Sequence, residues 1–380
     1  MKIVTIIGAR PQIIKAAALS RAIKKSFKDK ITEIIVHTGQ HYDDNMSGIF
    51  FEELQIPKPD YNLNVGSETH AKQTAAMLVG IEEILLKEKP QALVLYGDTN
   101  STLAGAIAAA KIHIPIVHIE AGLRSFNKTM PEEINRIMCD HASTLLFSPT
   151  KAGFTNLVKE GFKVDNVAPY SANNPKIYHC GDVMYDNSLH FAEVAEQKSN
   201  VLNTYALQKG NFILATIHRD NNTDIPQRLN ALFSALFETH QKNNISVILP
   251  LHPRTKKCVE QFLDKDLLNK ISASRQFIIC EPLPFLDMIM LEKNCGLVMT
   301  DSGGVQKEAF YFEKPCVIFR PETEWVELVE CGAAVLADAN KEEIISTYNH
   351  FSNAKLSFSK LFGDGKTAEF ICVEMLKHLS

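Results

Sequence analysis

The sequence contains no run of about 18 apolar residues, the length that a membrane-spanning helix needs. It also has no surplus of basic residues: its formal net charge is −4, which argues against a nucleic-acid-binding surface. Residues 1–8 read as a strand and are too short for a signal peptide. We therefore expect a cytoplasmic protein that binds neither membranes nor nucleic acids.

Paired cysteines are absent as well. The eight cysteines are scattered along the chain, and no C-x-x-C pair occurs among them. Several of them, including Cys280 and Cys316, lie in apolar runs typical of strands. We expect reduced, buried thiols, as is usual in the cytoplasm, and no metal site.

The chain has 380 residues, of which 45% are hydrophobic and 22% charged, and this length favours two globular domains. Short β-branched runs alternate with longer amphipathic stretches, a pattern typical of βαβ units and parallel sheets. Most of these runs are apolar throughout, as expected for strands covered by helices on both faces. The expected strands are residues 3–7, 34–38, 92–96, 114–119, 144–147, 212–216, 246–249, 277–280, 297–300 and 316–319.

A polar segment at residues 165–176 interrupts this alternation. We expect a Rossmann-like domain at residues 1–170 and a second one at residues 171–366, with the last helix, residues 367–380, packed back on the first domain. Two such domains would place their ligand crevices face to face, at the carboxyl ends of the strands. The predicted fold class is therefore α/β, with two Rossmann-like domains facing across a cleft.

The segment Asp301-Ser302-Gly303-Gly304 lies between an apolar run, residues 296–299, and an expected helix at residues 306–311. A hydroxyl and two glycines at this place let backbone N–H groups approach an anion at the positive end of a helix dipole. Glu308 would sit about one turn into the helix, within reach of a sugar hydroxyl. The alternative is an ordinary serine N-cap with a tight turn.

Charged side chains also follow several of the expected strands. In the first half, Asp98 and Glu120 follow strands, and Glu132 opens the next helix. In the second half, His218 and Arg219 follow a strand. Each has a plain structural alternative: Asp98 could cap a helix, Glu132 could be half of a charge pair at a helix start, and His218 could be a buried core histidine.

Taken together, these side chains suit two parts of one substrate. Carboxylates in the first half suit a sugar that develops positive charge at its anomeric carbon. Basic side chains and a helix start in the second half suit a nucleotide diphosphate and favour its departure as a leaving group.

On these residues the chain resembles the non-hydrolysing UDP-N-acetylglucosamine 2-epimerase family over essentially its whole length. The motifs that carry the resemblance are Gly8-Ala9-Arg10-Pro11 with Lys15, His37-Thr38-Gly39-Gln40-His41, Gly97-Asp98-Thr99, His118-Ile119-Glu120-Ala121-Gly122-Leu123-Arg124, Pro131-Glu132-Glu133-Ile134-Asn135-Arg136, His218-Arg219, and Thr300-Asp301-Ser302-Gly303-Gly304 with Glu308. The resemblance implies a glycosyltransferase-B-like architecture, a homodimer, and an isomerase that needs no metal, nicotinamide or other cofactor.

The resemblance also implies roles for single residues. It implies that Asp98, Glu120 and Glu132 are the catalytic carboxylates. It also implies that His218 is a catalytic residue and contacts the diphosphate. The residues implied to bind the nucleotide or substrate are Arg10, Lys15, Arg136, Arg219, His252, Ser302, Gly303, Gly304 and Glu308.

The implied reaction is a C2 epimerisation of UDP-N-acetylglucosamine to UDP-N-acetylmannosamine, for cell-surface polysaccharide precursors. UDP leaves from C1 as the C2 proton is removed, which gives a 2-acetamidoglucal, and UDP then adds back with a proton delivered to the other face. The sequence does not decide which carboxylate removes the proton and which returns one.

Several positions depart from the family pattern. Ala9 stands where threonine is usual, and Gln12 stands where glutamate is common. Residues 42–46 lack an arginine common in the family's regulatory UDP-N-acetylglucosamine site, which leaves allosteric activation open. Residues 322–327 contain Trp325, the only tryptophan of the chain. Trp325 either anchors the core or forms a wall of the substrate site. These departures resemble the branch that acts on UDP-2,3-diacetamido-2,3-dideoxyglucuronate, which stays as an alternative substrate.

Three other functions compete with this interpretation. A UDP-sugar glycosyltransferase of the same architecture would need an acceptor groove. A hydrolysing epimerase would release UDP and free N-acetylmannosamine. A nucleotide-sugar sensor would bind without turnover and would not need the set of carboxylates.

Overall fold

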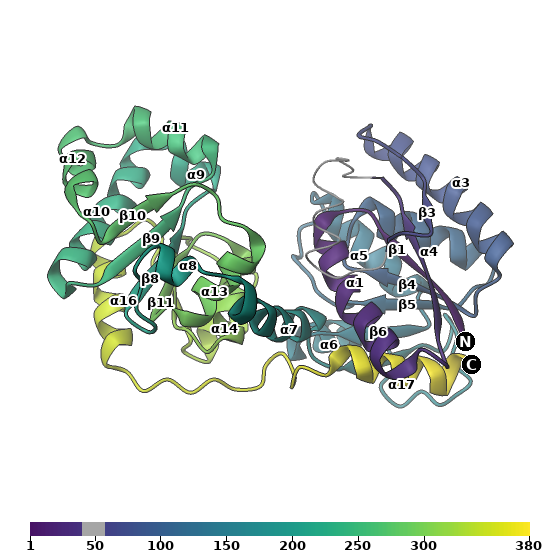
Figure 1. Ribbon diagram of the computed structural model, residues 1–380. Coiled ribbons are helices and arrows are strands. Elements are labelled where there is room, and N and C mark those ends of the chain that lie inside the picture. The colour runs from purple at the N-terminus through teal and green to yellow at the C-terminus, as the bar shows by residue number, and fades with distance from the viewer. Residues whose placement is uncertain (40–57) are drawn as a thin grey trace. The chain divides into compact units, whose positions relative to one another are not determined.

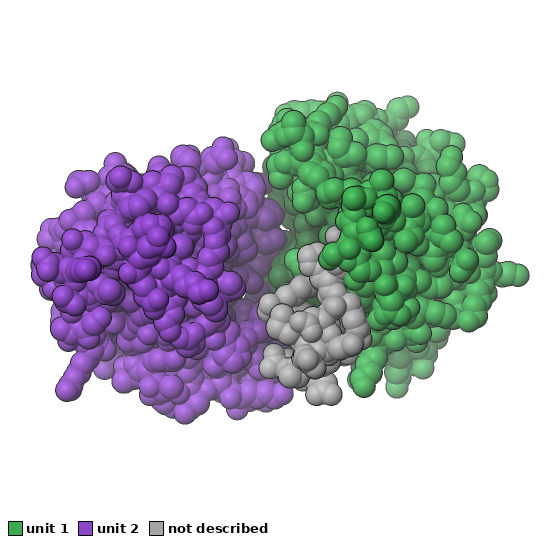
Figure 2. Space-filling model, turned by 90° about the horizontal axis from the view of Figure 1, so that it is seen from above, with its two compact units in different colours: residues 1–187, 360–380 green, residues 188–359 purple. Residues whose placement is uncertain are grey.

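The computed structural model describes residues 1–39 and 58–380, and it does not describe the side chain of Arg10 (Figure 1). The predicted motif residues Gln40 and His41, and the departures at residues 42–46, lie outside the described residues. The chain forms two compact units, which Figure 2 colours separately. Unit 1 comprises Met1–Asn187 with Lys360–Ser380, and unit 2 comprises Ser188–Ser359.

Unit 1 is built on a parallel sheet of seven strands in the order β3-β2-β1-β4-β5-β6-β7. The strands are β1 (Lys2–Ile7), β2 (Thr32–His37), β3 (Tyr61–Asn62), β4 (Ala92–Tyr96), β5 (Ile116–Ile119), β6 (Leu145–Ser148) and β7 (Lys176–His179). Its helices are α1 (Arg10–Ala22), which continues into a π-helical turn η1 (Ile23–Phe27), α3 (His70–Glu88), α4 (Asn100–Lys111), α5 (Pro131–Ala142), α6 (Lys151–Lys159) and α17 (Thr367–Leu379). Helix α7 (Val183–Lys198) begins in unit 1 and ends in unit 2.

Small side chains explain how closely α4 packs on the sheet of unit 1. Its buried face is formed by alanines and Gly105, and a β-carbon at Gly105 would lie 2.7 Å from Leu95. Val4, Ile6 and Leu93 face this helix and α3 in one fully buried cluster. Burial of these aliphatic side chains stabilises the unit by about 1.5–3 kcal/mol for each fully buried residue.

Unit 2 has a parallel sheet of six strands in the order β10-β9-β8-β11-β12-β13. The strands are β8 (Phe212–Thr216), β9 (Ser246–Pro250), β10 (Phe277–Cys280), β11 (Leu297–Thr300), β12 (Cys316–Ile318) and β13 (Ala334–Leu336). The helices are α8 (Val201–Thr204), α9 (Asp220–Thr223), α10 (Pro226–Asn243), α11 (Pro253–Phe262), α12 (Lys265–Ala273), α13 (Phe285–Asn294), α14 (Gly303–Tyr311), α15 (Val326–Glu330) and α16 (Lys341–Asn353).

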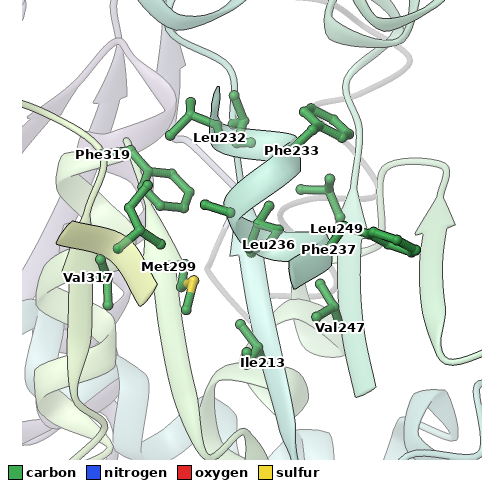
Figure 3. Packing of buried hydrophobic residues seen from close by; sticks show 14 of the residues in the cluster. Ile213, Leu232, Phe233, Leu236, Phe237, Val247, Leu249, Met299, Val317 and Phe319 are labelled. Carbon is green, nitrogen blue, oxygen red and sulfur yellow. The ribbon is translucent and has the colours of Figure 1, made fainter. Parts of the chain in front are cut away.

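The core of unit 2 lies between α10 and one face of its sheet. Leu232 and Leu236 from α10 belong to one buried cluster with Ile213, Val247 and Met299 from three strands (Figure 3). The α10 residues recur at three- and four-residue spacing, which places them on one helical face. This packing fixes the carboxyl ends of β8 and β11, where the candidate site of this unit lies.

Both sheets have the strand order of a Rossmann fold, so the predicted α/β class with two Rossmann-like domains is confirmed. The boundary expected after residue 170 is wrong, because β7 pairs with β6 and belongs to the first sheet, so that unit 1 extends to Asn187. Helix α17 belongs to unit 1, where it packs against α1, and Asp186 accepts its Thr367 and Ala368 N–H groups.

All eight cysteines are free thiols, four of them buried and four half-buried. Among the described residues, His, Cys, Asp and Glu side chains form no group of three that could hold a metal ion. No helix in the described part of the chain is long and apolar enough to cross a membrane.

Candidate active site

The candidate site of unit 1 lies where the strand order reverses, between β1 and β4. From β1 the chain proceeds to β2 on one side, whereas β4, β5 and β6 follow on the other. Ligands of such sheets bind outside the carboxyl ends of the strands at this point. Arg10, Asp98 and Glu120 follow β1, β4 and β5, so the topology brings these three predicted residues to one edge.

Glu120 and Lys15 form a close ion pair at this edge. The Lys15 Nζ lies 2.5 Å from Glu120 Oε2, and both side chains are less than 15% exposed. Burial would lower the pKa of Lys15, but Glu120 and then Asp98 raise it above its usual value. Lys15 is therefore a fixed cation that neutralises the Glu120 carboxylate.

The backbone of Glu120 is strained. Its φ angle is +74°, in the left-handed region that side chains other than glycine rarely adopt. Hydrogen bonds from the Glu120 and Ala121 N–H groups to the Phe147 carbonyl hold this conformation, each at 3.0 Å. Strain of this kind, of about 1–3 kcal/mol, is concentrated at functional sites.

Asp98 is held by neighbours on α5. Its Oδ2 lies 2.5 Å from Arg136 Nη2, and its backbone carbonyl accepts from Asn135 Nδ2 at 2.8 Å. Asp98 does not cap α4: Thr99 is the cap, and its side chain accepts the Thr102 N–H. The alternative of a helix cap is therefore wrong for Asp98.

The two acidic residues that open α5 have different environments. The Glu132 side chain is exposed and makes no hydrogen bond or ion pair within the described residues. Glu133 is buried and accepts from the Ser125 N–H and hydroxyl, the Phe126 N–H and Arg136. Burial opposes the charge of Glu133, but these hydrogen bonds lower its pKa. Glu133 thus fixes the loop that follows Glu120, while Glu132 stays open to a ligand.

Gln12 joins two loops of this edge, a role that its sequence position did not suggest. Its Oε1 accepts from the N–H groups of Gly8 and Ala9 at 2.9 and 3.2 Å. Its Nε2 donates to the Tyr96 carbonyl at 2.9 Å and to the Thr102 hydroxyl at 3.0 Å. An amide satisfies all four contacts, because its oxygen accepts and its nitrogen donates, whereas a carboxylate could not donate to the Tyr96 carbonyl.

In unit 2 the strand order reverses between β8 and β11, which gives a second candidate edge. His218 and Arg219 follow β8, His252 follows β9, and Ser302 follows β11. Arg219 is exposed, and the His252 ring caps α11 by accepting the Arg254 N–H at 3.3 Å. The topology thus gathers the predicted residues of this unit at the ends of three adjacent strands.

Asp301 organises the loop that carries His218. Its fully buried carboxylate accepts from the backbone N–H groups of His218 and Arg219 and from Asn222 Nδ2, each at 3.1 Å. The His218 Nδ1 lies 3.0 Å from Asp301 Oδ1. Burial would raise the pKa of Asp301, but these donors lower it. Because the His218 side chain is 51% exposed, the alternative of a buried core histidine is wrong.

The start of α14 has the geometry expected of an anion-binding helix end. Ser302 caps the helix by accepting the Val305 N–H, so the alternative of a serine N-cap is confirmed, and anion binding at this helix start stays a prediction. The N–H groups of Gly303 and Gly304 donate to no acceptor in the described part of the chain. A β-carbon at Gly303 would lie 2.0 Å from Glu324 Oε1, so the glycine leaves room for that carboxylate.

Trp325 contacts this helix start from the loop before α15. Its indole N–H donates to the Gly303 carbonyl at 3.0 Å, and Lys307 Nζ lies 4.3 Å from its ring centroid. Its backbone N–H donates to Thr323, whose hydroxyl donates to Gln306 at 2.6 Å. Trp325 therefore fixes the loop against α14 and is half-buried there.

Glu308 has a partner that the sequence did not indicate. The buried Glu292 of α13 lies against Glu308 of α14, close enough for each carboxyl group to shift the pKa of the other. Burial, and then the Glu308 charge, raise the pKa of Glu292 well above its usual value. Two neighbouring buried carboxyl groups cannot both be ionised at low cost, so we expect Glu292 to keep its proton beside Glu308.

A hollow of about 620 Å³ lies elsewhere on unit 1, over α5. It is lined by Arg124, Phe126, Lys128, Glu133, Ile137, His141 and Glu160. None of the three predicted catalytic carboxylates is among these residues. The candidate site is therefore defined by the strand ends and their ion pairs rather than by this hollow.

Comparison with known proteins shows the family to which the chain belongs. The sequence profile of the family described as UDP-N-acetylglucosamine 2-epimerase matches residues 23–377. The chain is 49% identical to the UDP-2,3-diacetamido-2,3-dideoxy-D-glucuronate 2-epimerase of Pseudomonas aeruginosa, over 99% of this chain and 100% of that protein.

Solved structures show the same likeness. The UDP-GlcNAc 2-epimerase of Methanocaldococcus jannaschii superposes over 100% of both chains, with a TM-score of 0.87 and 42% identity. That enzyme is also known in complex with UDP-GlcNAc and UDP. A plant glycosyltransferase, Phytolacca americana UGT2, is 13% identical with a TM-score of 0.59 over 99% of this chain and 93% of its own, which shows the shared fold alone. The chain belongs to the UDP-N-acetylglucosamine 2-epimerase family and is an isomerase.

Proposed function

We propose that this enzyme inverts C2 of UDP-N-acetylglucosamine without hydrolysis, by eliminating UDP and adding it back. The observation that carries the proposal is the pair of carboxylates at the ends of adjacent strands, Glu120 against Lys15 and Asp98 against Arg136. The sugar C2–H is not acidic, so its removal requires a well-placed base and simultaneous loss of a leaving group. Both carboxylates are held in one orientation, as such a base needs.

The departure and the return of UDP both require a diphosphate site, which we place in unit 2. The open N–H groups of Gly303 and Gly304 lie at the positive end of the α14 dipole. His218 and Arg219 follow the neighbouring strand β8 and add donors for phosphate oxygens. Glu308, held by Glu292, accepts from nucleotide hydroxyls in this proposal.

The chemistry balances in two steps. A carboxylate removes the C2 proton while the C1–O bond breaks, and the electron pair of the C–H bond becomes the C1=C2 double bond of 2-acetamidoglucal. UDP leaves with the electrons of the C1–O bond. In the reverse sense, a carboxylic acid protonates C2 from the other face, and the UDP oxygen closes on C1. Asp98, Glu120 and Glu132 are the proposed donors and acceptors of these protons.

The test is incubation with UDP-N-acetylglucosamine in D₂O without an acceptor, followed by proton NMR. The proposal predicts loss of the C2 proton signal and appearance of UDP-N-acetylmannosamine, with UDP still attached. Free N-acetylmannosamine would indicate a hydrolysing epimerase. An unchanged C2 signal with bound nucleotide would contradict the reaction and favour a transferase or a sensor.

The second candidate substrate is UDP-2,3-diacetamido-2,3-dideoxyglucuronate. It is favoured by the 49% identity to the Pseudomonas aeruginosa enzyme and by the Lys307–Trp325 contact, which contains the tryptophan that departs from the common family pattern. The C3 and C6 substituents take no part in bond breaking, so both sugars suit one mechanism. The same NMR experiment with both UDP-sugars at equal concentration identifies the preferred one by its rate of C2 exchange. The homodimer, the cytoplasmic location and the supply of polysaccharide precursors stay predictions of this proposal.

A further inference from the structure

A buried cluster of charged side chains lies behind the carboxylate edge of unit 1. His118 of β5 and Asp140 of α5 are both fully buried, and Arg124 beside them is 1% exposed. Arg124 also pairs with Glu160 through two hydrogen bonds, at 2.7 and 2.6 Å. None of these four residues belongs to the proposed reaction, although burying so many charges is costly unless they serve each other.

Both ring nitrogens of His118 face oxygen atoms that accept hydrogen bonds. The Nε2 lies 2.8 Å from the Gly97 carbonyl oxygen, which can only accept. The Nδ1 lies 2.7 Å from Asp140 Oδ1. A neutral imidazole carries one N–H and would leave a lone pair facing one of these oxygens. With Asp140 ionised, only the imidazolium form satisfies both contacts.

Asp140 has the contacts of an ionised carboxylate. Its Oδ2 accepts from the Gly122 N–H at 3.1 Å and lies 2.7 Å from Arg124 Nη2. Burial alone would raise the pKa of Asp140, but His118 and Arg124 lower it. Burial would likewise lower the pKa of His118, but Cys139 and Asp140, consecutive on α5, raise it well above its usual value.

The His118 ring also ties the two loops that carry the proposed catalytic carboxylates. Gly97 accepts from the ring through its carbonyl, and its own N–H donates to the Ile119 carbonyl at 3.0 Å. Gly97 directly precedes Asp98, and its φ angle of +61° is one that glycine adopts readily. On the other side, Asp140 holds the Gly122 N–H, two residues after Glu120. One charged ring therefore bridges the backbone next to Asp98 and, through Asp140, the backbone next to Glu120.

We propose that His118 is a permanently protonated positioning residue that holds Asp98 and Glu120 in place by joining the Gly97 carbonyl to the Asp140 carboxylate. The roles of Asp98 and Glu120 in this statement rest on the proposed function. The charge state of His118 does not, so the two can be tested separately.

The charge state is tested on the unmodified protein by long-range proton–nitrogen NMR of its 13 histidines. We expect one imidazole whose two nitrogens both stay protonated from about pH 6 to about pH 9, above the ordinary range of histidine. If every imidazole loses a proton in that range, the proposal is wrong. This result does not depend on turnover, so failure of the proposed function would leave it intact.

Two variants then separate the two contacts of the ring. In His118→Gln the amide nitrogen takes the place of Nε2 and can still donate to Gly97, whereas in His118→Asn it takes the place of Nδ1 and can donate only to Asp140. We expect H118N to lower kcat on the order of 10²-fold, the cost of a catalytic group displaced by about 1 Å. H118Q should retain more of kcat, and UDP affinity, to which we propose that unit 2 contributes most, should change little in either.

If a variant lost its fold in general, UDP affinity would fall together with kcat. A fall in kcat at unchanged UDP affinity therefore separates a positioning role from a merely structural one. Equal kcat in both variants, or a lower kcat in H118Q than in H118N, would contradict the positioning role. If neither variant folds, the NMR measurement on the unmodified protein still decides the charge state on which the proposal depends.

Discussion

Replacing Glu292 by glutamine should change how the stability of unit 2 depends on pH. Glu292 is 2% exposed, and its Oε2 has no hydrogen-bond partner within the described residues. Burial, and then contact with Glu308, raise the pKa of Glu292 well above its usual value. The folded state therefore keeps a proton that the unfolded chain releases near pH 4.3, the ordinary range of glutamate.

The sign and size follow from proton linkage. Because the pKa of Glu292 is raised in the folded state, its contribution to stability is fully present below the unfolded pKa and is lost as pH rises toward the folded pKa. One extra bound proton corresponds to about 1.4 kcal/mol of unfolding free energy per pH unit. The amide of E292Q can donate to Glu308 as the protonated acid does, but it does not titrate. From pH 6 upward, the variant should therefore gain about 1.4 kcal/mol per pH unit over the wild type, until the folded pKa is reached.

The only tryptophan makes this measurable in one unit. Trp325 lies in unit 2 and is bonded to the start of α14, so its fluorescence reports unfolding of that unit. Urea unfolding at a series of pH values gives the free energy of unfolding for the wild type and for E292Q. Glu193→Gln, at an exposed position of α7 in unit 2, is the matched control for the change in charge. Parallel pH profiles for wild type and E292Q would refute a shared proton between Glu292 and Glu308.

Three further substitutions test the two edges. Glu120→Gln keeps the shape of the side chain beside Lys15 but removes a base, so kcat should fall by about 10²-fold to 10⁴-fold with UDP affinity unchanged; unchanged turnover would remove Glu120 from the mechanism. His218→Ala should weaken UDP binding, measured by calorimetry, by about 1.5–3 kcal/mol if the ring bonds a charged phosphate, and an unaltered dissociation constant would argue against that contact. Gln12→Glu removes the donor to the Tyr96 carbonyl and should lower the unfolding free energy of unit 1 by about 1–3 kcal/mol, more at high pH, where the acid is ionised; circular dichroism showing equal stability at pH 8 would contradict this account.

The sequence predicted the sheets because parallel strands are apolar on both faces and local in the chain. It also placed Asp98, Glu120 and His218 at strand ends, since that position depends only on where each strand stops. It did not predict which side chain meets which. His218 and Asp301 are 83 residues apart, and Gln12 meets Tyr96 across 84 residues, so these pairs exist only once the strands are arranged in the sheet. The domain boundary was missed for the same reason, because β7 is defined by its pairing with β6.

Buried charge is the property that periodicity conceals most completely. Glu292 lies in an apolar helix, where the sequence alone suggests a solvent-facing residue. His118 lies in an apolar strand, where the sequence alone suggests a core histidine. Their meaning comes from a single facing group, Glu308 for the first and the Gly97 carbonyl for the second. A signal was present in the motif around Asp301, an acid at the end of a buried strand, but its partners lay in another part of the chain.

The two edges use opposite backbone groups, and this determines what each can bind. In unit 1, the carbonyl groups of Tyr96, Gly97 and Asp98 accept hydrogen bonds from side chains. These hydrogen bonds fix the turn that carries the Asp98 carboxylate. In unit 2, Asp301 accepts the N–H groups of His218 and Arg219, so those amides cannot serve an anion. At the end of β11 the N–H groups of Gly303 and Gly304 stay available to a diphosphate, while His218 and Arg219 can contribute only their side chains. We therefore expect a diphosphate to bind at the first turn of α14, with the His218 and Arg219 side chains of the β8 loop adding positive charge to it.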